Sequence, residues 1–114
     1  MSDNFQGGAF ALPERPVMRE IPPFRLKPLP LDAEAGALPP FKWAGKDIGH
    51  RHQLGGKPQF LQADEVPKCT CGKRMTFYAQ LDSINDEFVI ADCGMIYVFL
   101  CFDCFETKSI VQSY

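Results

Sequence analysis

The stretch "CTCGKRMTFYAQL", residues 69–81, joins two closely spaced cysteines to a segment in which apolar and polar residues alternate. Successive side chains of an extended chain point to opposite sides, so residues two apart share a face. One face of this segment then carries its four apolar side chains, those of Met75, Phe77, Ala79 and Leu81. The pattern predicts a half-buried β-strand that begins directly after a cysteine-containing turn.

Several other segments also have the composition of strands. Residues 95–102, "MIYVFLCF", are apolar and rich in β-branched and aromatic residues, which predicts a central strand buried on both faces. Residues 58–62 and 88–91 are shorter strand candidates, and residues 109–114 are predicted to pair with the central strand as a final hairpin. Only residues 32–36, "DAEAG", suggest a helical turn. The predicted fold is mainly β, a small antiparallel sheet with a zinc knuckle at one end.

The N-terminal part, residues 1–48, differs in composition from the rest. Eight of the ten prolines lie in the first forty residues, which excludes a long helix or a central strand there. We expect a proline-rich extended wrap around a β-rich zinc-binding core, residues 49–114, within a single domain spanning residues 1–114. The anchors proposed for the wrap are Phe24, Leu26, Leu29 and Leu31. The alternative is a partly disordered tail to about Gln6, followed by a loose surface strand.

Charge and hydropathy narrow the functional classes. The net charge is −2, but residues 1–74 hold eleven of the twelve Lys and Arg, whereas residues 75–107 hold six acids and no base. Nucleic acid is an unfavourable partner for such an acidic half, because phosphate backbones require a basic footprint. No apolar run is long enough to cross a bilayer, and the first residues lack the pattern of a secretory signal. The expected location is the cytoplasm.

Four of the five cysteines form two pairs that the predicted sheet would bring together. Cys69 and Cys71 precede the alternating strand, whereas Cys101 and Cys104 lie at the end of the central strand. If these strands are antiparallel neighbours, the start of one meets the end of the other. Four thiolates from two turns are typical of a structural Zn²⁺ site, which has no open position for catalysis. Gly72 would allow the first turn to bend sharply.

Other interpretations of these cysteines remain open. The Cys-x-Cys pair is tighter than the usual spacing of zinc ligands, and the thiols could also be free and structural. A disulfide within Cys-x-Cys would be strained, and a redox pair would need a helix after Cys101 that the sequence does not indicate. Cys93 is interpreted as a small buried residue at a turn. His50 and His52 are likewise interpreted as structural, since no base, nucleophile or carboxylate cluster accompanies them.

Four segments in order support a family resemblance: "HQLGGKPQFLQ" (52–62), "PKCTCGKRMTFYAQLD" (67–82), "DCGMIYVFLCFDC" (92–104) and the terminal "SIVQSY". Together, over residues 50–113, they resemble the conserved block of the YwqG-like family, which is related to the programmed cell death protein 2 family. The resemblance implies that His52, Leu54, Gly55 and Gly56 form a turn leading into the sheet. It also implies that Cys69, Cys71, Cys101 and Cys104 stand where metal-binding relatives place their thiols.

The resemblance implies protein-binding roles. Relatives are generally longer, often with two similar β-rich halves, so a homodimer or a partner chain would supply the missing surface. Cys93 stands where a small residue such as glycine is expected, and Phe60 stands where relatives tend to carry Trp. Bacterial members are mostly uncharacterised, some being suspected immunity proteins against toxins, and the eukaryotic relatives act as dedicated chaperones of a ribosomal protein.

Three functions are therefore weighed. The favoured hypothesis is a non-catalytic, zinc-stabilised module that binds another protein, with the acidic half suited to a basic client. The alternative is a zinc-ribbon-like nucleic-acid binder, in which a basic patch near the knuckle would bind phosphates while Tyr78 stacks on a base; the patch comprises Lys57, Lys68, Lys73 and Arg74. A small enzyme using His50, His52 and Cys93 is the least favoured hypothesis.

Overall fold

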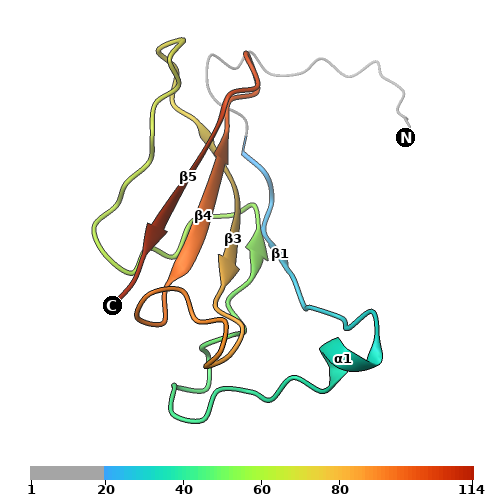
Figure 1. The fold of residues 1–114 in the computed structure, drawn as a ribbon. Coiled ribbons are helices and arrows are strands. Elements are labelled where there is room, and N and C mark those ends of the chain that lie inside the picture. Colours follow the sequence, from blue (N-terminus) through green and yellow to red (C-terminus); the bar gives the residue numbers. More distant parts are fainter. Residues whose placement is uncertain (1–19) are drawn as a thin grey trace.

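The computed structural model describes residues 20–114 and contains one five-stranded antiparallel sheet (Figure 1). Its elements, in chain order, are β1 (Phe24–Arg25), α1 (Ala33–Gly36), β2 (Gln53–Leu54), β3 (Thr76–Asp82), β4 (Met95–Leu100) and β5 (Thr107–Gln112). The strands lie in the sheet in their sequence order, each antiparallel to the next. This confirms the predicted mainly β, antiparallel class.

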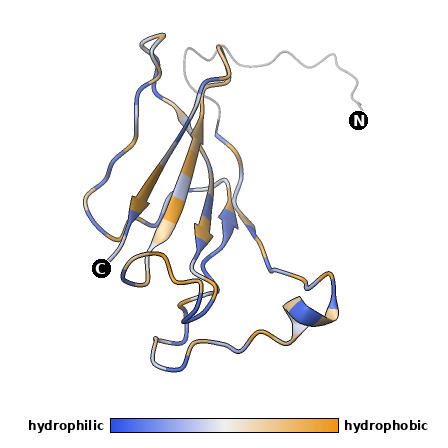
Figure 2. Cartoon of the chain, in the orientation of Figure 1, coloured by the Kyte–Doolittle hydropathy of each residue, from blue (hydrophilic) through white to orange (hydrophobic). Residues whose placement is uncertain are grey.

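The three long strands β3, β4 and β5 form the body of the sheet. β4 lies between the other two, as expected for its apolar sequence, and Figure 2 shows most of its length in the hydrophobic colour. The predicted final hairpin is present, because β5 pairs with β4 along its whole length from Thr107 to Gln112. Met95, Tyr97 and Phe99 of β4 are fully buried on one face of the sheet.

The face alternation in β3 is interrupted by a β-bulge. The pairing with β4 shifts register between Phe77 and Ala79, so the side chains after the bulge exchange faces. Gln80 and Asp82 are buried on the core face, whereas Leu81, predicted to lie there, is 42% exposed on the other face. The prediction that Ala79 and Leu81 share a face with Met75 and Phe77 was therefore wrong, because strict alternation holds only while the register is unbroken.

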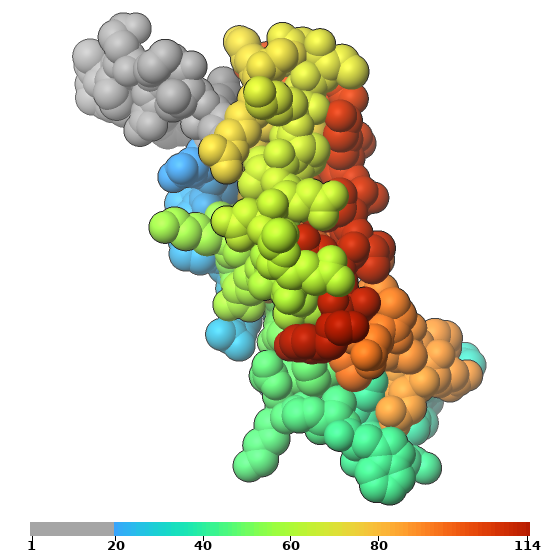
Figure 3. Space-filling view, turned by 90° about the vertical axis from the view of Figure 1, so that its left-hand side faces the viewer, coloured from blue at the N-terminus to red at the C-terminus, as the bar shows by residue number. Residues whose placement is uncertain are grey.

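The central strand was predicted to be buried on both faces, and only one face is. Along β4 the burial alternates, with Ile96, Val98 and Leu100 only partly buried between their fully buried neighbours. One face is covered by residues 57–66, which include Phe60, and these lie in front of the sheet in Figure 3 (yellow-green). β4 is apolar on both sides, but the described part of the chain supplies a cover for one side only.

Two short predicted strands do not form. Residues 58–62 and 88–91 are irregular in the structure. The first of these segments is attached to the sheet by buried polar side chains: Gln80 Oε1 accepts a hydrogen bond from the Gln59 amide at 3.0 Å, and Gln112 Oε1 accepts one from the Gln62 amide at 2.9 Å. Side chains therefore replace a strand ladder in satisfying this backbone.

The proline-rich segment is extended from residue 20, as predicted, but its proposed anchors do not enter the core. Phe24, Leu26, Leu29 and Leu31 are all exposed, with Leu31 at 98%. The pairing of Phe24–Arg25 with β2 attaches the segment to the sheet, and beyond it the chain leaves the sheet as an arm that carries α1 (Figure 1). The arm returns to the loop after β3, where Asn85 Nδ2 donates a hydrogen bond to the Pro39 carbonyl. The predicted helical turn is present there, with Asp32 as its N-cap. The proposed tail to Gln6 lies outside the described residues.

Within residues 20–114, no helix has both the length and the apolar character needed to cross a bilayer.

Candidate metal centre

Two tight turns meet at one end of the sheet, at the top of Figure 1. The first lies between the bridge-paired residues Lys68 and Arg74 and is closed by a hydrogen bond of 2.8 Å from the Cys69 amide to the Lys73 carbonyl. The second connects β4 to β5 and is closed by hydrogen bonds between Cys101 and Glu106 and between Phe105 and Cys101. Because β3 begins where β4 ends, the two turns face each other.

The turns bring four thiols together. The Sγ atoms of Cys69, Cys71, Cys101 and Cys104 all lie within 4.8 Å of one another. Cys71 Sγ is 3.7 Å from Cys101 Sγ, and Cys69 Sγ is 2.9 Å from Cys104 Sγ. A tetrahedral site with Zn–S bonds of about 2.3 Å requires sulfur–sulfur separations of about 3.8 Å. The four thiols can therefore hold a metal ion after small adjustments, and no disulfide links them.

Within the cluster, the first cysteine of each pair is more shielded than the second. Cys69 and Cys101 are 3% and 2% exposed and belong to the hydrophobic core, whereas Cys71 and Cys104 are exposed. Phe77 and Phe99 belong to the same core cluster as the two shielded thiols. The four-cysteine cluster therefore lies at the end of the hydrophobic core and is continuous with it.

Backbone amides at the second turn favour a thiolate. Hydrogen bonds from the backbone of Cys104 and Asp103 lower the pKa of Cys101 to about 7. A thiol must lose its proton to bind a metal, so this turn prepares one ligand at neutral pH. Without a metal, the contact with Cys104 and the hydrogen bond to Glu106 raise the pKa of Cys69.

Glu106 is a neighbour of the cluster that the sequence analysis missed. Its Oε1 accepts hydrogen bonds from Cys69 Sγ at 3.0 Å, from the Thr70 amide at 3.0 Å and from the Thr70 hydroxyl at 2.8 Å. These contacts, led by that with Cys69, lower the pKa of Glu106 to about 2. Glu106 therefore fastens the first turn to the second as an ionised acceptor. Its place two residues after Cys104, directly before β5, was the available signal.

Both turns use a left-handed residue directly after the second cysteine. Gly72 has φ +92°, as its sequence position predicted, whereas Phe105 occupies the equivalent place with φ +64°. Phenylalanine is unfavourable in this conformation, and its side chain is 68% exposed. Neither the exposure of the Phe105 side chain nor its backbone conformation stabilises the fold, so stability does not explain a phenylalanine at this position.

Gly72 provides a test of the turn conformation alone. A Cβ added at Gly72 has no atom within 4 Å, so Gly72→Ala introduces backbone strain without a clash. We expect a loss of about 1–2 kcal/mol in the free energy of unfolding, because left-handed φ is costly for alanine. The metal content should be unchanged. Urea unfolding and metal analysis of the two proteins would check this, and equal stability would show that the turn does not need glycine.

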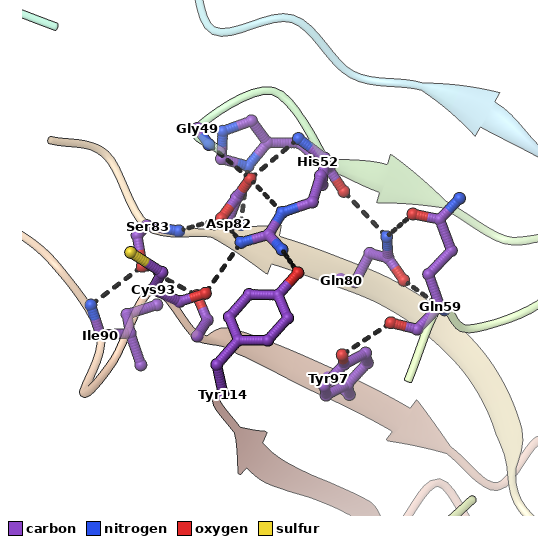
Figure 4. A network of polar contacts seen from close by, with 12 residues as sticks. Gly49, His52, Gln59, Gln80, Asp82, Ser83, Ile90, Cys93, Tyr97 and Tyr114 are labelled. Carbon is purple, nitrogen blue, oxygen red and sulfur yellow. Dashed lines mark hydrogen bonds and ion pairs between the residues drawn. The ribbon is translucent and has the colours of Figure 1, made fainter. Parts of the chain in front are cut away.

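A second polar cluster lies at the opposite end of β3 (Figure 4). Arg51 and Asp82 form a buried ion pair of 2.7 Å, and Asp82 Oδ2 also accepts the backbone amides of Gly49 and Arg51. Burial would raise the pKa of Asp82, but the hydrogen bonds from Arg51 and Gly49 outweigh it and lower the pKa. The same hydrogen bond raises the pKa of Arg51. The network ties the loop before β2 to the end of β3.

The residues singled out by the family resemblance take part in this scaffold. His52 is buried, and its Nδ1 accepts a hydrogen bond of 3.0 Å from the Asp82 amide; burial lowers its pKa. Leu54 belongs to β2, and both Gly55 and Gly56 have positive φ where the chain turns out of that strand. At Gly55, a Cβ would come within 2.5 Å of the Pro22 carbonyl oxygen. These positions therefore shape a turn at the sheet and are not beside the four thiols.

Two of the remaining candidates from the sequence adjoin the Arg51–Asp82 network, and most of the basic ones belong to the first cysteine turn. His50 is exposed, and Cys93 is partly buried with φ +53°, its carbonyl accepting a hydrogen bond from Arg51. Of the proposed basic patch, Lys73 forms an exposed ion pair of 3.0 Å with Asp103, which raises the pKa of Lys73. Among residues 20–114, only the four-cysteine cluster groups three or more potential metal ligands.

Comparisons with known proteins give little functional information. No family model matches the chain, and no solved structure matches it. A curated protein described as "Uncharacterized protein YpfL", from Salmonella typhimurium, is 39% identical over 61 residues. The match covers 53% of this chain and 14% of that protein, so the chain spans about a seventh of the length of the relative it matches.

Proposed function

We propose that the protein is a non-catalytic module that binds another protein and whose fold is stabilised by a structural Zn²⁺ ion. The observation that carries this proposal is the closed set of four cysteine thiols, all within 4.8 Å of one another. A metal held by four protein ligands has no open coordination position for a substrate. Four thiolates from two turns favour zinc among the biological metals, although iron also accepts such a set.

The binding surface is proposed to include the tip of the second turn. Phe105 is 68% exposed in a backbone conformation that costs stability, and such strain is often retained where a residue has a recognition role. Aromatic side chains that enter a pocket of the partner contribute strongly to binding. The metal would hold this turn rigid, so that little conformational entropy is lost when the partner binds.

The sequence predicts that the acidic half of this protein would bind a basic client. In the structure, fewer of its acidic side chains are available for such binding than the sequence suggests. Of the six acids in residues 75–107, Asp82 is buried in an ion pair, and Asp103 is paired with Lys73. Glu106 accepts three hydrogen bonds from the first turn. A basic client would therefore meet mainly Asp86, Glu87 and Asp92, in the loop at the other end of the sheet. The immunity and chaperone roles differ only in the client and remain proposals.

The test compares the wild-type protein with Phe105→Gly in affinity capture from the native host. We expect the wild type to retain a specific protein, to form a stoichiometric complex with it when both are purified, and to lose at least tenfold in affinity in the variant. Phe105→Gly relieves the positive φ, so its fold and metal content should be preserved. Leu31→Ala, an exposed apolar position on the arm, is the matched control.

Three results would contradict the proposal. One is a purified complex whose affinity is unchanged in Phe105→Gly. Another is salt-dependent binding of DNA or RNA in place of a protein, which would favour the nucleic-acid hypothesis. The third is turnover of a substrate that requires the metal.

A further inference from the structure

The sheet has a second face that the described residues leave open. Residues directly opposite each other in a sheet share a face, so the strand pairing defines that face row by row. One row consists of Phe24, Leu54, Ala79, Val98 and Ser109, and the next consists of Leu81, Ile96 and Val111. Thr76, which is buried, belongs to a third row with Leu100 and Thr107. We call this surface the apolar face.

The apolar face is exposed where a folded domain would normally be covered. Val111 is 54% exposed, Phe24 53% and Leu81 42%. At the centre of the face, Ile96 and Val98 are only partly buried, and the small side chain of Ala79 is buried. On the opposite face, their neighbours along the strands are buried, including Met95, Tyr97 and Gln112. A sheet that is apolar on both faces normally packs a layer against each of them.

The chemistry of the face limits what can cover it. None of the strand residues that the structure places on it is charged. A charged partner surface would have no opposite charge to pair with on this face. Another apolar sheet of the same shape would fit it better. Two such sheets packed about 10 Å apart form a sandwich whose inner side chains interdigitate. A second copy of this chain supplies such a surface, because a two-fold axis makes a patch complementary to itself.

The area of the face fits only a small interface. Three strands of six or seven residues and two strands of two residues, spaced by about 4.8 Å and rising by about 3.4 Å per residue, give a footprint of about 370 Å² per copy. Two copies together would bury about 750 Å², less than the roughly 1,200 Å² of standard stable interfaces. Affinity at this size is weak, so the dissociation constant of the dimer is expected in the upper micromolar range.

We propose that the protein forms a two-fold symmetric dimer in which the apolar faces of two copies pack against each other as a two-layer β-sandwich. The metal centres lie at the end of the sheet rather than on this face, so dimer formation leaves the turn of Phe105 accessible. The dimer is independent of the client proposed above, and each can fail without the other.

The experiment is sedimentation equilibrium of the zinc-loaded full chain between about 1 and 200 µM. The wild type should approach twice the 12.8 kDa of one chain as its concentration rises. In Leu81→Lys, the dissociation constant should rise about 100-fold or more, because the two-fold axis would bury two lysine ammonium groups without partners. Val111→Lys should do the same. Leu31→Lys, on the arm, should leave the dimer unchanged.

The two variants also distinguish a face-to-face dimer from pairing of the open edge at β5. Val111 lies on the edge strand, but Leu81 lies on β3, two strands away. An edge-paired dimer would therefore survive Leu81→Lys, and that result would overturn the proposal. A wild-type protein that stays monomeric at 200 µM would overturn it as well. Circular dichroism and metal content should match the wild type, because both side chains are already half exposed.

Discussion

Replacing Cys101 by serine is expected to abolish metal binding and, with it, the cooperative folding of the protein. The Cys101 thiol is 2% exposed, and all four cysteine sulfurs of the cluster lie within 4.8 Å of one another. Serine is a poor ligand for soft metals, so three thiolates would remain. Structural Zn²⁺ sites contribute about 10–16 kcal/mol to folding, as much as the whole stability of a small domain.

The measurement is metal analysis of protein purified without added metal, followed by thermal unfolding. The wild type should contain about one zinc per chain and unfold cooperatively, whereas Cys101→Ser should contain none and show no cooperative transition. Cys93→Ser is the matched control, since Cys93 lies outside the cluster and should retain the metal. A wild-type protein that folds without zinc would refute the metal centre. Iron in place of zinc would keep the centre but change its chemistry.

The fold class and the cysteine cluster could both be predicted from the sequence, because both follow from local patterns in two neighbouring strands. Alternation after Cys71 identified one strand, and the apolar run before Cys101 identified its neighbour. Antiparallel pairing of neighbouring strands then places the start of β3 beside the end of β4, which is where the structure has them. Local patterns were sufficient because both turns are short and each carries its own pair of thiols.

Features that depend on distant residues were not predicted. The bulge between Phe77 and Ala79 follows from how β3 meets β4, and the alternating sequence of β3 contains no sign of it. Asp82 was counted as surface charge because its partner, Arg51, is 31 residues earlier in an irregular segment. The exposure of one face of β4 was not predicted either. An apolar strand has the same sequence whether the layer that packs on its second face belongs to this chain or to another.

Asp82→Asn is expected to lower the free energy of unfolding by about 3–5 kcal/mol, because it leaves the buried guanidinium of Arg51 without a counter-charge. The side chain of Asp82 is 0% exposed and that of Arg51 only 8%. Since the pKa of Asp82 is lowered in the fold, its stabilising contribution is present above the pKa of an unfolded aspartate, about 3.9, and is lost as the pH falls further. Urea unfolding at pH 7 therefore measures it in full.

Two comparisons separate the charge from other effects of Asp82→Asn. Asp103→Asn removes an ion pair of similar length that is 60% exposed, and it should cost less than about 1 kcal/mol because solvent screens the charges. Arg51→Met combined with Asp82→Asn removes both charges, so the double variant should be more stable than the sum of the two single losses predicts. Strict additivity, or a loss below 1 kcal/mol in Asp82→Asn, would show that the ion pair does not hold the loop before β2 against the sheet.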